Sequence, residues 1–419
     1  MPAPVAREAK PMPEKIPSDA KDKRIENNIL VICVDPPWRP VSGADLRNWR
    51  TVLAARRLGQ VTVLSLWRNE DAPPVPYGID LLSLTDLPAS AIFRRPPGGT
   101  RIDLTFPAGS LEAFEAVLDR CKASAVIFEN LALHPLLAAP GLRRSAVILD
   151  MHNVESALIA ATEARWKRLM GMDRTVKAVR RLEDQALRRV DEVWICSEID
   201  RDRLRRIHPA SAPSHVIPNA VPMTFSAPEK GRAVIPKADG PRLLFVGHLS
   251  YRPNIQAARI LARSILPAAR ASFPGASLVL AGRSPHKRVK ALTGPGITVS
   301  ADPVSMAPHY AEADIAVVPL RSGGGTRIKI LEAMAAGIPV VASARAVEGL
   351  ELVPERHFLA AETVPQFAQQ IKSLYRDRVF ATQIVKSAHE YVEREFGAER
   401  IDGLICTRIE DAIGRFRNP

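Results

Sequence analysis

Short runs of apolar, mostly β-branched residues alternate along this chain with segments whose apolar residues recur at helical spacing. The runs contain few polar positions, which is typical of parallel strands that are covered on both faces. The expected strands are residues 29–34, 61–66, 125–129, 146–150, 192–197, 215–218, 242–247, 277–281, 297–300, 314–319 and 339–343. This repeated α/β alternation predicts two Rossmann-like, doubly wound domains that face a central cleft.

Changes in composition predict the domain boundaries. Residues 1–28 are rich in Pro, Lys, Glu and Ala and lack the apolar core of a signal peptide, so we expect a disordered lead. The first domain is expected at 29–226 and the second at 242–397. A Pro/Lys/Gly-rich linker at 227–241 separates them, and residues 398–419 form a C-terminal helix.

The cysteines and the apolar runs indicate the compartment. Cys33, Cys121, Cys196 and Cys406 are scattered, and two of them lie in strand-like apolar runs, which predicts buried reduced thiols. No apolar run approaches the ~20 residues that a membrane-spanning helix needs. We therefore expect a cytoplasmic protein.

The formal net charge of +13 calls for an anionic partner. No nucleic-acid recognition module and no basic stripe interleaved with aromatic residues is present, so nucleic acid is not expected. Two explanations stay open: an anionic ligand in the cleft, and peripheral attraction to anionic lipid headgroups at the inner membrane face. The most basic helical segment, residues 165–189, fits a solvated face and a membrane contact equally well.

Residues 319–343 predict a strand, a glycine loop, a helix, a glycine stop and a second strand. Gly323, Gly324 and Gly325 allow a tight turn whose N–H groups point at a ligand. Thr326 is expected to cap the helix that follows. A helix N-terminus behind such a loop is an anion site, so we expect a phosphate there.

The first turn of this helix carries charge of an unusual sign. Arg327 and Lys329 are basic, whereas a helix supporting only itself would prefer acids at this end. Glu332 follows Lys329 by three residues on the same face, so it can reach a sugar or ribose hydroxyl while the loop holds a diphosphate. A solvated Lys329–Glu332 pair is the alternative, and we favour the ligand site.

With these residues the sequence resembles the retaining, nucleotide-sugar-dependent glycosyltransferases of the GT-B fold, in the group called family 4. The family signature has two glutamates eight positions apart, followed by a run that matches residues 333–341. Glu332 matches the second glutamate, whereas Gly324 stands where the first would fall. The chain is similar to a subgroup with a Gly-Gly-Thr-Arg-x-Lys loop, in which Arg327 and Lys329 occupy the site.

The resemblance assigns further residues to the donor side. Residues 246–254 resemble the first strand and loop of the family's nucleotide domain, which implies that Gly247 lies against the donor. In relatives an arginine and a lysine near Arg252 hold the phosphates, and here Asn254 stands near the place of the missing lysine. Arg252 and Lys329 would thus neutralise the leaving diphosphate. The family's last helix also crosses back onto the first domain.

The side of the first domain that faces the expected cleft contains two more candidate ligand-binding residues, Gly43 and His152. Gly43 lets the backbone approach the donor phosphates, or is a simple turn glycine. Asp45 and Arg47, on the same helix start, face either the cleft or solvent. His152 follows a buried strand, where open α/β sheets place ligand groups, and the family has a histidine there. We expect His152 to bind the donor sugar or the acceptor, without acting as a general base.

Metal chemistry is not expected. An Asp-x-Asp string occurs at Asp200 and Asp202, but it belongs to a capping box that opens a helix, so we interpret it as structural. Fixed positive groups would then stabilise the leaving phosphates without a metal or another cofactor. Asn219 is interpreted as a turn residue, and Glu348 is a weaker candidate for the donor pocket.

The sequence therefore predicts transfer of a sugar from a nucleotide-diphosphate sugar to a glycan or lipid-linked acceptor, in surface polysaccharide or glycoconjugate synthesis. Two alternatives remain. One is a nucleotide-sugar epimerase of the same architecture, which would need carboxylates facing the sugar. The other is a binding protein that has kept the nucleotide site without catalysis, in line with the missing first glutamate.

Overall fold

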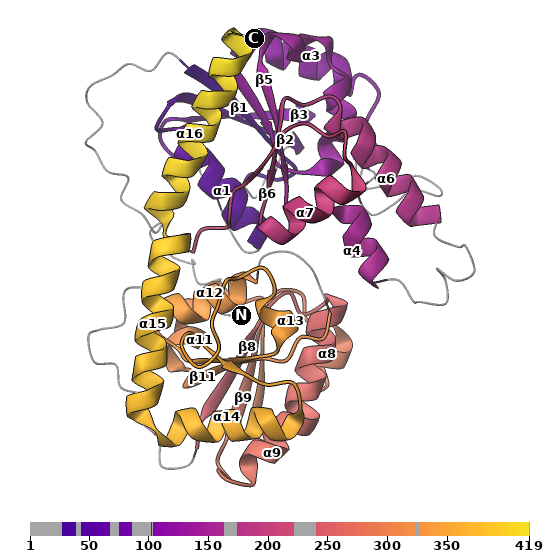
Figure 1. The fold of residues 1–419 in the computed structure, drawn as a ribbon. Coiled ribbons are helices and arrows are strands. Elements are labelled where there is room, and N and C mark those ends of the chain that lie inside the picture. Colours follow the sequence, from indigo (N-terminus) through magenta and orange to yellow (C-terminus); the bar gives the residue numbers. More distant parts are fainter. Residues whose placement is uncertain are drawn as a thin grey trace, which may run out of the picture.

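The computed structural model describes residues 27–38, 43–67, 75–85, 102, 104–162, 174–221, 240–322 and 327–418. Two parallel sheets dominate it, each covered by helices (Figure 1). The strand orders are β3-β2-β1-β4-β5-β6-β7 and β10-β9-β8-β11-β12-β13. The chain order reverses beside β1 in the first sheet and beside β8 in the second, as in doubly wound folds. The prediction of two Rossmann-like α/β domains is confirmed.

The strands of the first domain are β1 Asn27–Cys33, β2 Gly59–Trp67, β3 Ile79–Thr85, β4 Ala125–Phe128, β5 Ala146–Met151, β6 Glu192–Ile195 and β7 Ser214–Val216. Its helices are α1 Gly43–Ala55, α3 Ser110–Cys121, α4 Glu155–Thr162, α6 Arg174–Leu187 and α7 Glu198–Ile207, with the short 3₁₀ helices η1 Leu131–Ala138 and η2 Pro140–Arg144.

The strands of the second domain are β8 Arg242–Val246, β9 Ser277–Gly282, β10 Ile297–Ala301, β11 Ile315–Val318, β12 Val340–Ala342 and β13 Leu359–Ala360. Its helices are α8 Arg252–Ile260, the π-helical turn η3 Leu261–Ile265, α9 Leu266–Arg270, α10 Lys287–Lys290, α11 Ala307–Glu312, α12 Ile328–Ala335, α13 Ala344–Val347, α14 Val364–Arg376 and α15 Arg378–Phe396. The last helix is α16 Ala398–Arg417.

The central strand β1 shows why the apolar runs form parallel strands. Leu30 and Ile32 pack into one hydrophobic core, whereas Ile29 and Val31 pack into a second core on the opposite face. Because both faces of the strand are covered, the alternation of apolar and polar residues seen in half-exposed strands is absent. The sequence of β1 is therefore a continuous apolar run. β1 begins at Asn27, so residues 27 and 28 belong to the sheet, whereas residues 1–26 of the expected lead lie outside the described residues.

Two strands were not predicted. β3 lies at the edge of its sheet and carries polar Asp80 and Ser83, while β13 has two residues. Neither shows the continuous apolar run of an inner strand. Most of the expected linker, residues 227–239, lies outside the described part of the chain.

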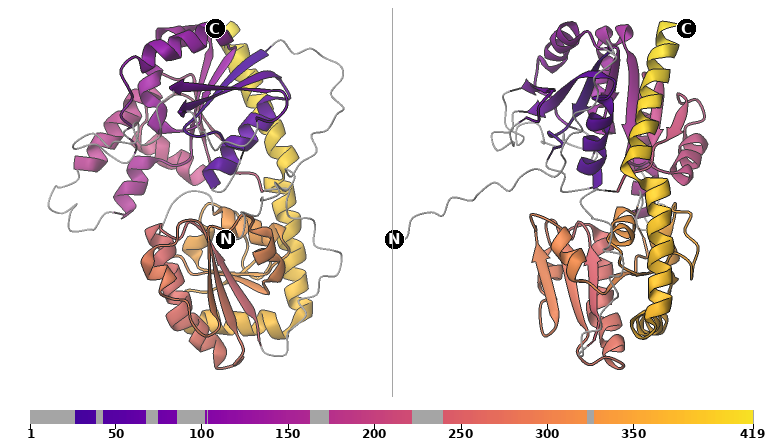
Figure 2. Two further views of the ribbon diagram at one scale, coloured as in Figure 1. Left: turned by 180° about the vertical axis from the view of Figure 1, so that it is seen from behind. Right: turned by 90° about the vertical axis from the view of Figure 1, so that its left-hand side faces the viewer.

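The C-terminal helix α16 runs from the second domain back along the first (Figure 2). Four of its isoleucines, Ile401, Ile405, Ile409 and Ile413, are buried in the hydrophobic core that β1 and α1 share. The buried Asp402 also receives Arg57 from the first domain at 2.7 Å. The chain end thus completes the core of the first domain.

Helix α6 covers much of the basic segment identified in the sequence. Its apolar residues Val176, Val179 and Leu187 are at most 4% exposed, whereas the basic Lys177 and Arg180 point to solvent. The apolar stripe is therefore used for packing within the domain, and only the charged face is accessible. Within the described residues, no helix combines the length and apolarity required to cross a bilayer.

We predict that Ile409→Ala destabilises the first domain. Ile409 is 0% exposed, so truncation should lower the free energy of unfolding by about 2–5 kcal/mol through lost burial and a residual cavity. All five tryptophans lie between residues 38 and 194, so their fluorescence during urea unfolding reports this domain. The exposed Glu410→Ala in the same helix should change stability by less than about 0.5 kcal/mol. Equal losses in the two variants would contradict the role of α16 in this core.

Candidate active site

A buried ion pair joins α1 to β5 at the carboxyl end of the first sheet. Nε and Nη2 of Arg47 donate to the two carboxylate oxygens of Asp150, both at 2.7 Å. Nη1 donates to the carbonyl oxygen of Ile217 at 2.6 Å and to Oδ1 of Asn219 at 2.9 Å. Burial alone would lower the pKa of Arg47, but Asp150 raises it, so the guanidinium keeps its charge. Arg47 is 4% exposed and hence faces neither cleft nor solvent, the two positions that the sequence left open.

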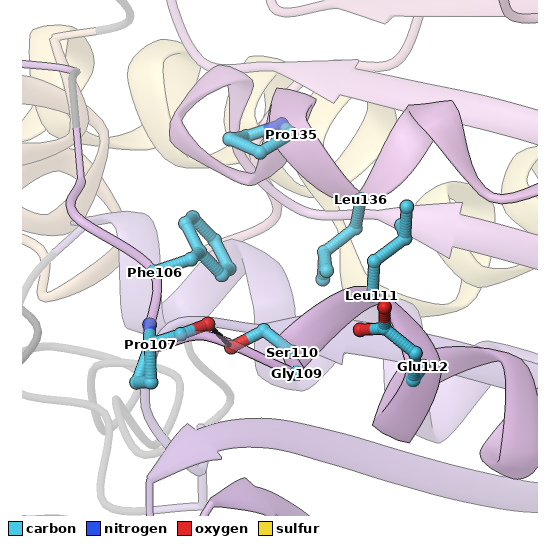
Figure 3. Close-up of a pocket in the computed structure, with 8 residues that line it drawn as sticks. All are labelled: Phe106, Pro107, Gly109, Ser110, Leu111, Glu112, Pro135 and Leu136. Atoms are coloured by element: carbon cyan, nitrogen blue, oxygen red, sulfur yellow. Dashed lines mark hydrogen bonds between the residues drawn. The ribbon is translucent and has the colours of Figure 1, made fainter.

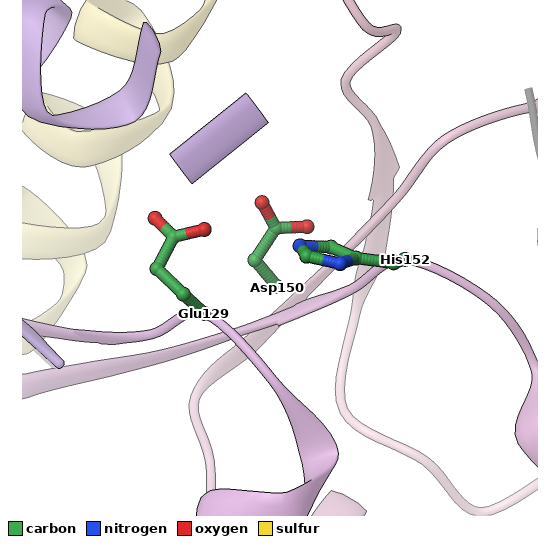
Figure 4. Close-up of side chains that lie close together, drawn as sticks. All are labelled: Glu129, Asp150 and His152. Carbon is green, nitrogen blue, oxygen red and sulfur yellow. The ribbon is translucent and has the colours of Figure 1, made fainter. Parts of the chain in front are cut away.

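Three more polar side chains surround this pair. Glu129 follows β4 and His152 follows β5, so both lie beside Asp150 (Figure 4). Asn48 of α1 lies between them. In the amide orientation that satisfies its neighbours, Nδ2 is 3.0 Å from Oε2 of Glu129 and 3.0 Å from Nε2 of His152. Nε2 therefore accepts a hydrogen bond, and in the neutral imidazole Nδ1 carries the proton.

Burial sets the protonation of this cluster. Desolvation, together with the charge of Asp150, raises the pKa of Glu129 well above its usual range, which favours the protonated carboxyl. Desolvation also lowers the pKa of His152 to about 4, so the imidazole is neutral. The first domain thus offers a neutral hydrogen-bonding imidazole that rests on a charge-balanced network.

The same cluster does not fit a metal ion. Ligand atoms of Glu129, Asp150 and His152 lie within 4.8 Å of one another. However, Arg47 already binds both oxygens of Asp150, and its positive charge repels a cation. The raised pKa of Glu129 also disfavours the carboxylate form that metal binding requires.

The second domain places Lys329 against neutral groups. Its Nζ donates to Oδ1 of Asn254 at 2.7 Å and lies 4.5 Å from the centroid of the Phe245 ring. Nδ2 of Asn254 donates in turn to the carbonyl oxygen of His248 at 2.9 Å. A Cβ on Gly247 would lie 2.7 Å from Nζ of Lys329, so a larger residue here would displace this amine. The structure therefore brings together Gly247, Asn254 and Lys329, three of the residues predicted from the sequence.

Glu332 lies about one helical turn beyond Lys329 in α12 and has a different hydrogen-bond partner. Its Oε2 accepts a hydrogen bond from the hydroxyl of Tyr310 at 2.8 Å. Burial raises the pKa of Glu332 to about 7 and lowers that of Lys329 to about 7. Burial also lowers the pKa of Arg327, which is 6% exposed. The start of α12 thus holds two basic groups in a desolvated environment, where charge interacts strongly with an anion.

The two domains meet beside these groups. A Cβ on Gly43 would lie 3.5 Å from Cδ1 of Ile328, so the start of α1 faces the start of α12. Arg283 approaches Asp45 at 3.9 Å across the same junction. Asp45 is therefore directed toward the second domain. The approach of Gly43 to the donor phosphates stays a prediction.

The remaining residues predicted on the donor side have different outcomes. Gly323, Gly324, Gly325 and Thr326 lie outside the described residues. Helix α12 begins at Ile328 with Arg327 in the cap position, so the prediction that Thr326 caps this helix is wrong. Arg252 is the exposed first residue of α8.

The acidic residues near the domain junction have structural partners. Oγ of Ser197 accepts from the N–H of Asp200 at 3.2 Å, as the capping box predicts, and Asp200 pairs with Arg203 at 2.8 Å. Arg203 also reaches Glu348 of the second domain at 3.4 Å, while Arg345 binds Glu348 at 2.6 Å. Glu348 is therefore held by two arginines at the junction.

Sequence reasoning missed the roles of Arg47, Asn48, Glu129 and Asp150. One signal was available: Asp150 ends an apolar strand, and a buried carboxylate requires a cation. Sequence periodicity could not identify Arg47 as that cation, because Arg47 lies 103 positions from Asp150 in the chain.

A pocket of about 180 Å³ lies elsewhere in the first domain (Figure 3). It is formed between the start of α3 and η1, and is lined by residues that include Phe106, Ser110 and Leu136. None of the predicted site residues lines it, so it is separate from the candidate active site.

Comparison with known proteins agrees with this architecture. Residues 240–377 match the model of the family described as Glycosyl transferases group 1. A search of the curated proteins gives no match. Among solved structures, sucrose-phosphate synthase of Thermosynechococcus elongatus is similar, with a TM-score of 0.71 and 19% identity over 92% of this chain and 99% of that chain.

Two further structures share the fold. WaaG, a glycosyltransferase involved in lipopolysaccharide biosynthesis, has a TM-score of 0.64 and 15% identity over 90% of this chain and 99% of its own. HepE of Anabaena, in complex with UDP and glucose, has a TM-score of 0.64 and 13% identity over 92% of this chain and 99% of its own. The fold is GT-B. Together with the matched domain, it indicates an enzyme of the glycosyltransferase class.

Proposed function

We propose that this GT-B enzyme is a retaining glycosyltransferase of the family 4 type that moves a sugar from a nucleotide-diphosphate sugar to a glycan or lipid-linked acceptor. One observation carries the proposal. Lys329, beside the start of α12, donates to the neutral amide of Asn254, while Glu332 accepts from Tyr310. Among the described residues, Nζ of Lys329 thus has a neutral amide as its hydrogen-bond acceptor, at a helix end that itself favours anions.

A diphosphate fits this environment. Its charge would compensate Lys329 in a site of low dielectric constant, and the interaction strengthens as negative charge grows on the leaving group. Arg327 and Arg252 are the other basic groups that we assign to the phosphates. We assign Glu332 to the ribose hydroxyls. HepE, which shares the fold, has been solved with UDP and glucose, which supports a nucleotide-sugar donor.

The first domain supplies the sugar side of the site in this proposal. His152 is neutral, and its Nδ1–H is a hydrogen-bond donor suited to a sugar hydroxyl. With a pKa of about 4, His152 is a weak base, so we assign it to positioning of the donor sugar or acceptor. The leaving phosphate would take the acceptor proton in a retaining transfer.

The acceptor belongs, we propose, to surface polysaccharide or glycoconjugate synthesis. Its lipid anchor would bring the enzyme to an anionic membrane, where the basic face of α6 with Lys177 and Arg180 offers an electrostatic contact. Insertion of this helix is not part of the proposal, because its apolar residues are buried within the domain.

Nucleotide release that depends on an acceptor tests the proposed transfer. We expect UDP-, GDP- or ADP-sugars to raise the thermal stability by mass action, and the best of them to release its nucleotide only when a glycan acceptor is added. Release should continue in EDTA, since basic side chains stabilise the leaving group. Epimerisation without acceptor, or loss of activity in EDTA with recovery in magnesium, would contradict the proposal.

We predict that His152→Ala lowers turnover more than it lowers nucleotide affinity. The nucleotide would bind to the second domain, whereas His152 lies on the first, beside the reacting sugar. Turnover should fall by about tenfold or more, as expected for loss of a positioned group, and the Kd for the free nucleotide should stay nearly constant. Steady-state kinetics and calorimetry measure the two quantities. Normal turnover would show that His152 is structural.

We also predict that UDP affinity falls as pH rises above 7. The pKa of Lys329 in the free protein is about 7, so the amine loses its proton above this pH, while UDP stays fully charged. Affinity should fall toward that of Lys329→Met, which we expect to bind about 10–100-fold more weakly through loss of a charge-assisted hydrogen bond.

Calorimetry between pH 6 and 9 checks this dependence. Glu332 titrates in the same range, so the matched control is Glu332→Gln, which should keep the decline above pH 7. Lys329→Met should show none. A decline of equal size in Lys329→Met would assign the pH dependence to another group.

A further inference from the structure

His208 has two carboxylate partners although it is almost fully buried. It caps the C-terminal end of α7 and is 2% exposed. Its Nε2 lies 2.8 Å from Oε2 of Glu183, and its Nδ1 lies 2.6 Å from Oδ1 of Asp184. Both partners come from α6. This triad lies outside the residues that we assign to donor and acceptor.

The geometry favours a charged ring. A neutral imidazole has one N–H, so one of its nitrogens would direct a lone pair at a carboxylate. Only the imidazolium can donate to both Glu183 and Asp184. Burial alone would lower the pKa of His208, but the hydrogen bonds that its ring donates to the two carboxylates raise it above its usual value. Glu183 is 0% exposed and therefore needs this cation.

The second oxygen of Glu183 leads toward the candidate active site. Oε1 accepts the backbone N–H of Ser156 at 3.0 Å. Ser156 lies in the first turn of α4, where backbone N–H groups have no partner within their own helix. Glu183 thus caps α4 from a neighbouring helix, and its negative charge also suits that end of the helix.

The capped helix directly follows the turn that carries His152. That turn joins β5 to α4 across residues 152–154, so Ser156 is four positions beyond His152. Fixing the start of α4 therefore fixes one end of a short connection whose other end is a buried strand. Small displacements of a positioned group can change reaction rates strongly.

We propose that His208 is a positioning residue: its imidazolium holds the Glu183 carboxylate against Ser156 N–H, and thereby fixes the turn that presents His152. The inference rests on the proposed function only in assigning His152 to the transfer. The link from His208 to Ser156 is a property of the first domain and is testable without turnover.

The surroundings of His208 define its response to pH. Glu183 and Asp184 face it from α6. Arg205 and Arg206 of its own helix α7 are exposed to solvent. As pH rises through the raised pKa of His208, the ring loses one proton and the charge on buried Glu183 loses its counter-ion. The hydrogen bond to Ser156 should therefore be intact at low pH and loosen at alkaline pH.

Wild-type protein provides the first test. With ¹⁵N-labelled histidine, NMR should show both ring nitrogens of His208 protonated at pH 6.5, with a titration midpoint above that value. Hydrogen exchange at the Ser156 amide should be slow, after correction for the intrinsic pH dependence, until His208 deprotonates. A neutral ring at pH 6.5, or exchange at Ser156 that does not follow the His208 titration, would overturn the proposal.

Variants give the second test. His208→Gln and Glu183→Gln should accelerate Ser156 exchange and lower turnover by about tenfold, with an unchanged Kd for UDP. Asp184→Asn is the comparison variant, because it removes one of the two carboxylates that raise the pKa of His208 but leaves Glu183, which accepts the Ser156 N–H. It should keep slow exchange and normal turnover at low pH, and the loosening at Ser156 should begin at a lower pH than in the wild type. Tryptophan fluorescence verifies that each variant is folded. Fast exchange with normal turnover would refute the link to His152, whereas absence of transfer in the wild type would refute the proposed function alone.

Discussion

The buried ion pair between Arg47 and Asp150 is the interaction on which the first half of the site depends. It ties α1 to β5 and to the segment after β7, and it is withdrawn from water. Losing one partner of such a pair costs about 3–5 kcal/mol, because the other charge stays buried. The charge of Asp150 helps to raise the pKa of Glu129 beside it, and Asn48 bridges Glu129 to the neutral ring of His152.

The two domains treat buried charge in opposite ways. In the first domain Arg47 and Asp150 neutralise each other, so the surface presented by His152 is polar and uncharged. In the second domain Lys329 binds a neutral amide, so its charge is available to an anion. A substrate with an anionic end and a neutral end matches this asymmetry. A nucleotide-diphosphate sugar has that form, which is why the geometry and the matched domain support the same proposal.

The sequence predicted what is encoded locally. Continuous apolar runs identified the inner strands, and the pattern from Arg327 to Glu332 identified the basic start of α12. Pairings between distant residues could not be predicted this way. Arg47 meets Asp150, and His208 meets Glu183, through the folding of separate elements, and neither pair belongs to a motif. Edge strand β3 was missed for a related reason, since its polar positions resemble those of a loop.

Helix α16 makes the first domain discontinuous in the chain. Its isoleucines complete a core whose other members, apart from that helix, come from residues before 221. During synthesis the chain emerges at about 5–20 residues per second, so the first domain must wait for the whole second domain before that core can close. Until α16 leaves the ribosome, an apolar face of the first sheet stays uncovered. The nascent chain therefore presents a surface for chaperones while the second domain is being translated, and a stop codon shortly before α16 would harm the first domain.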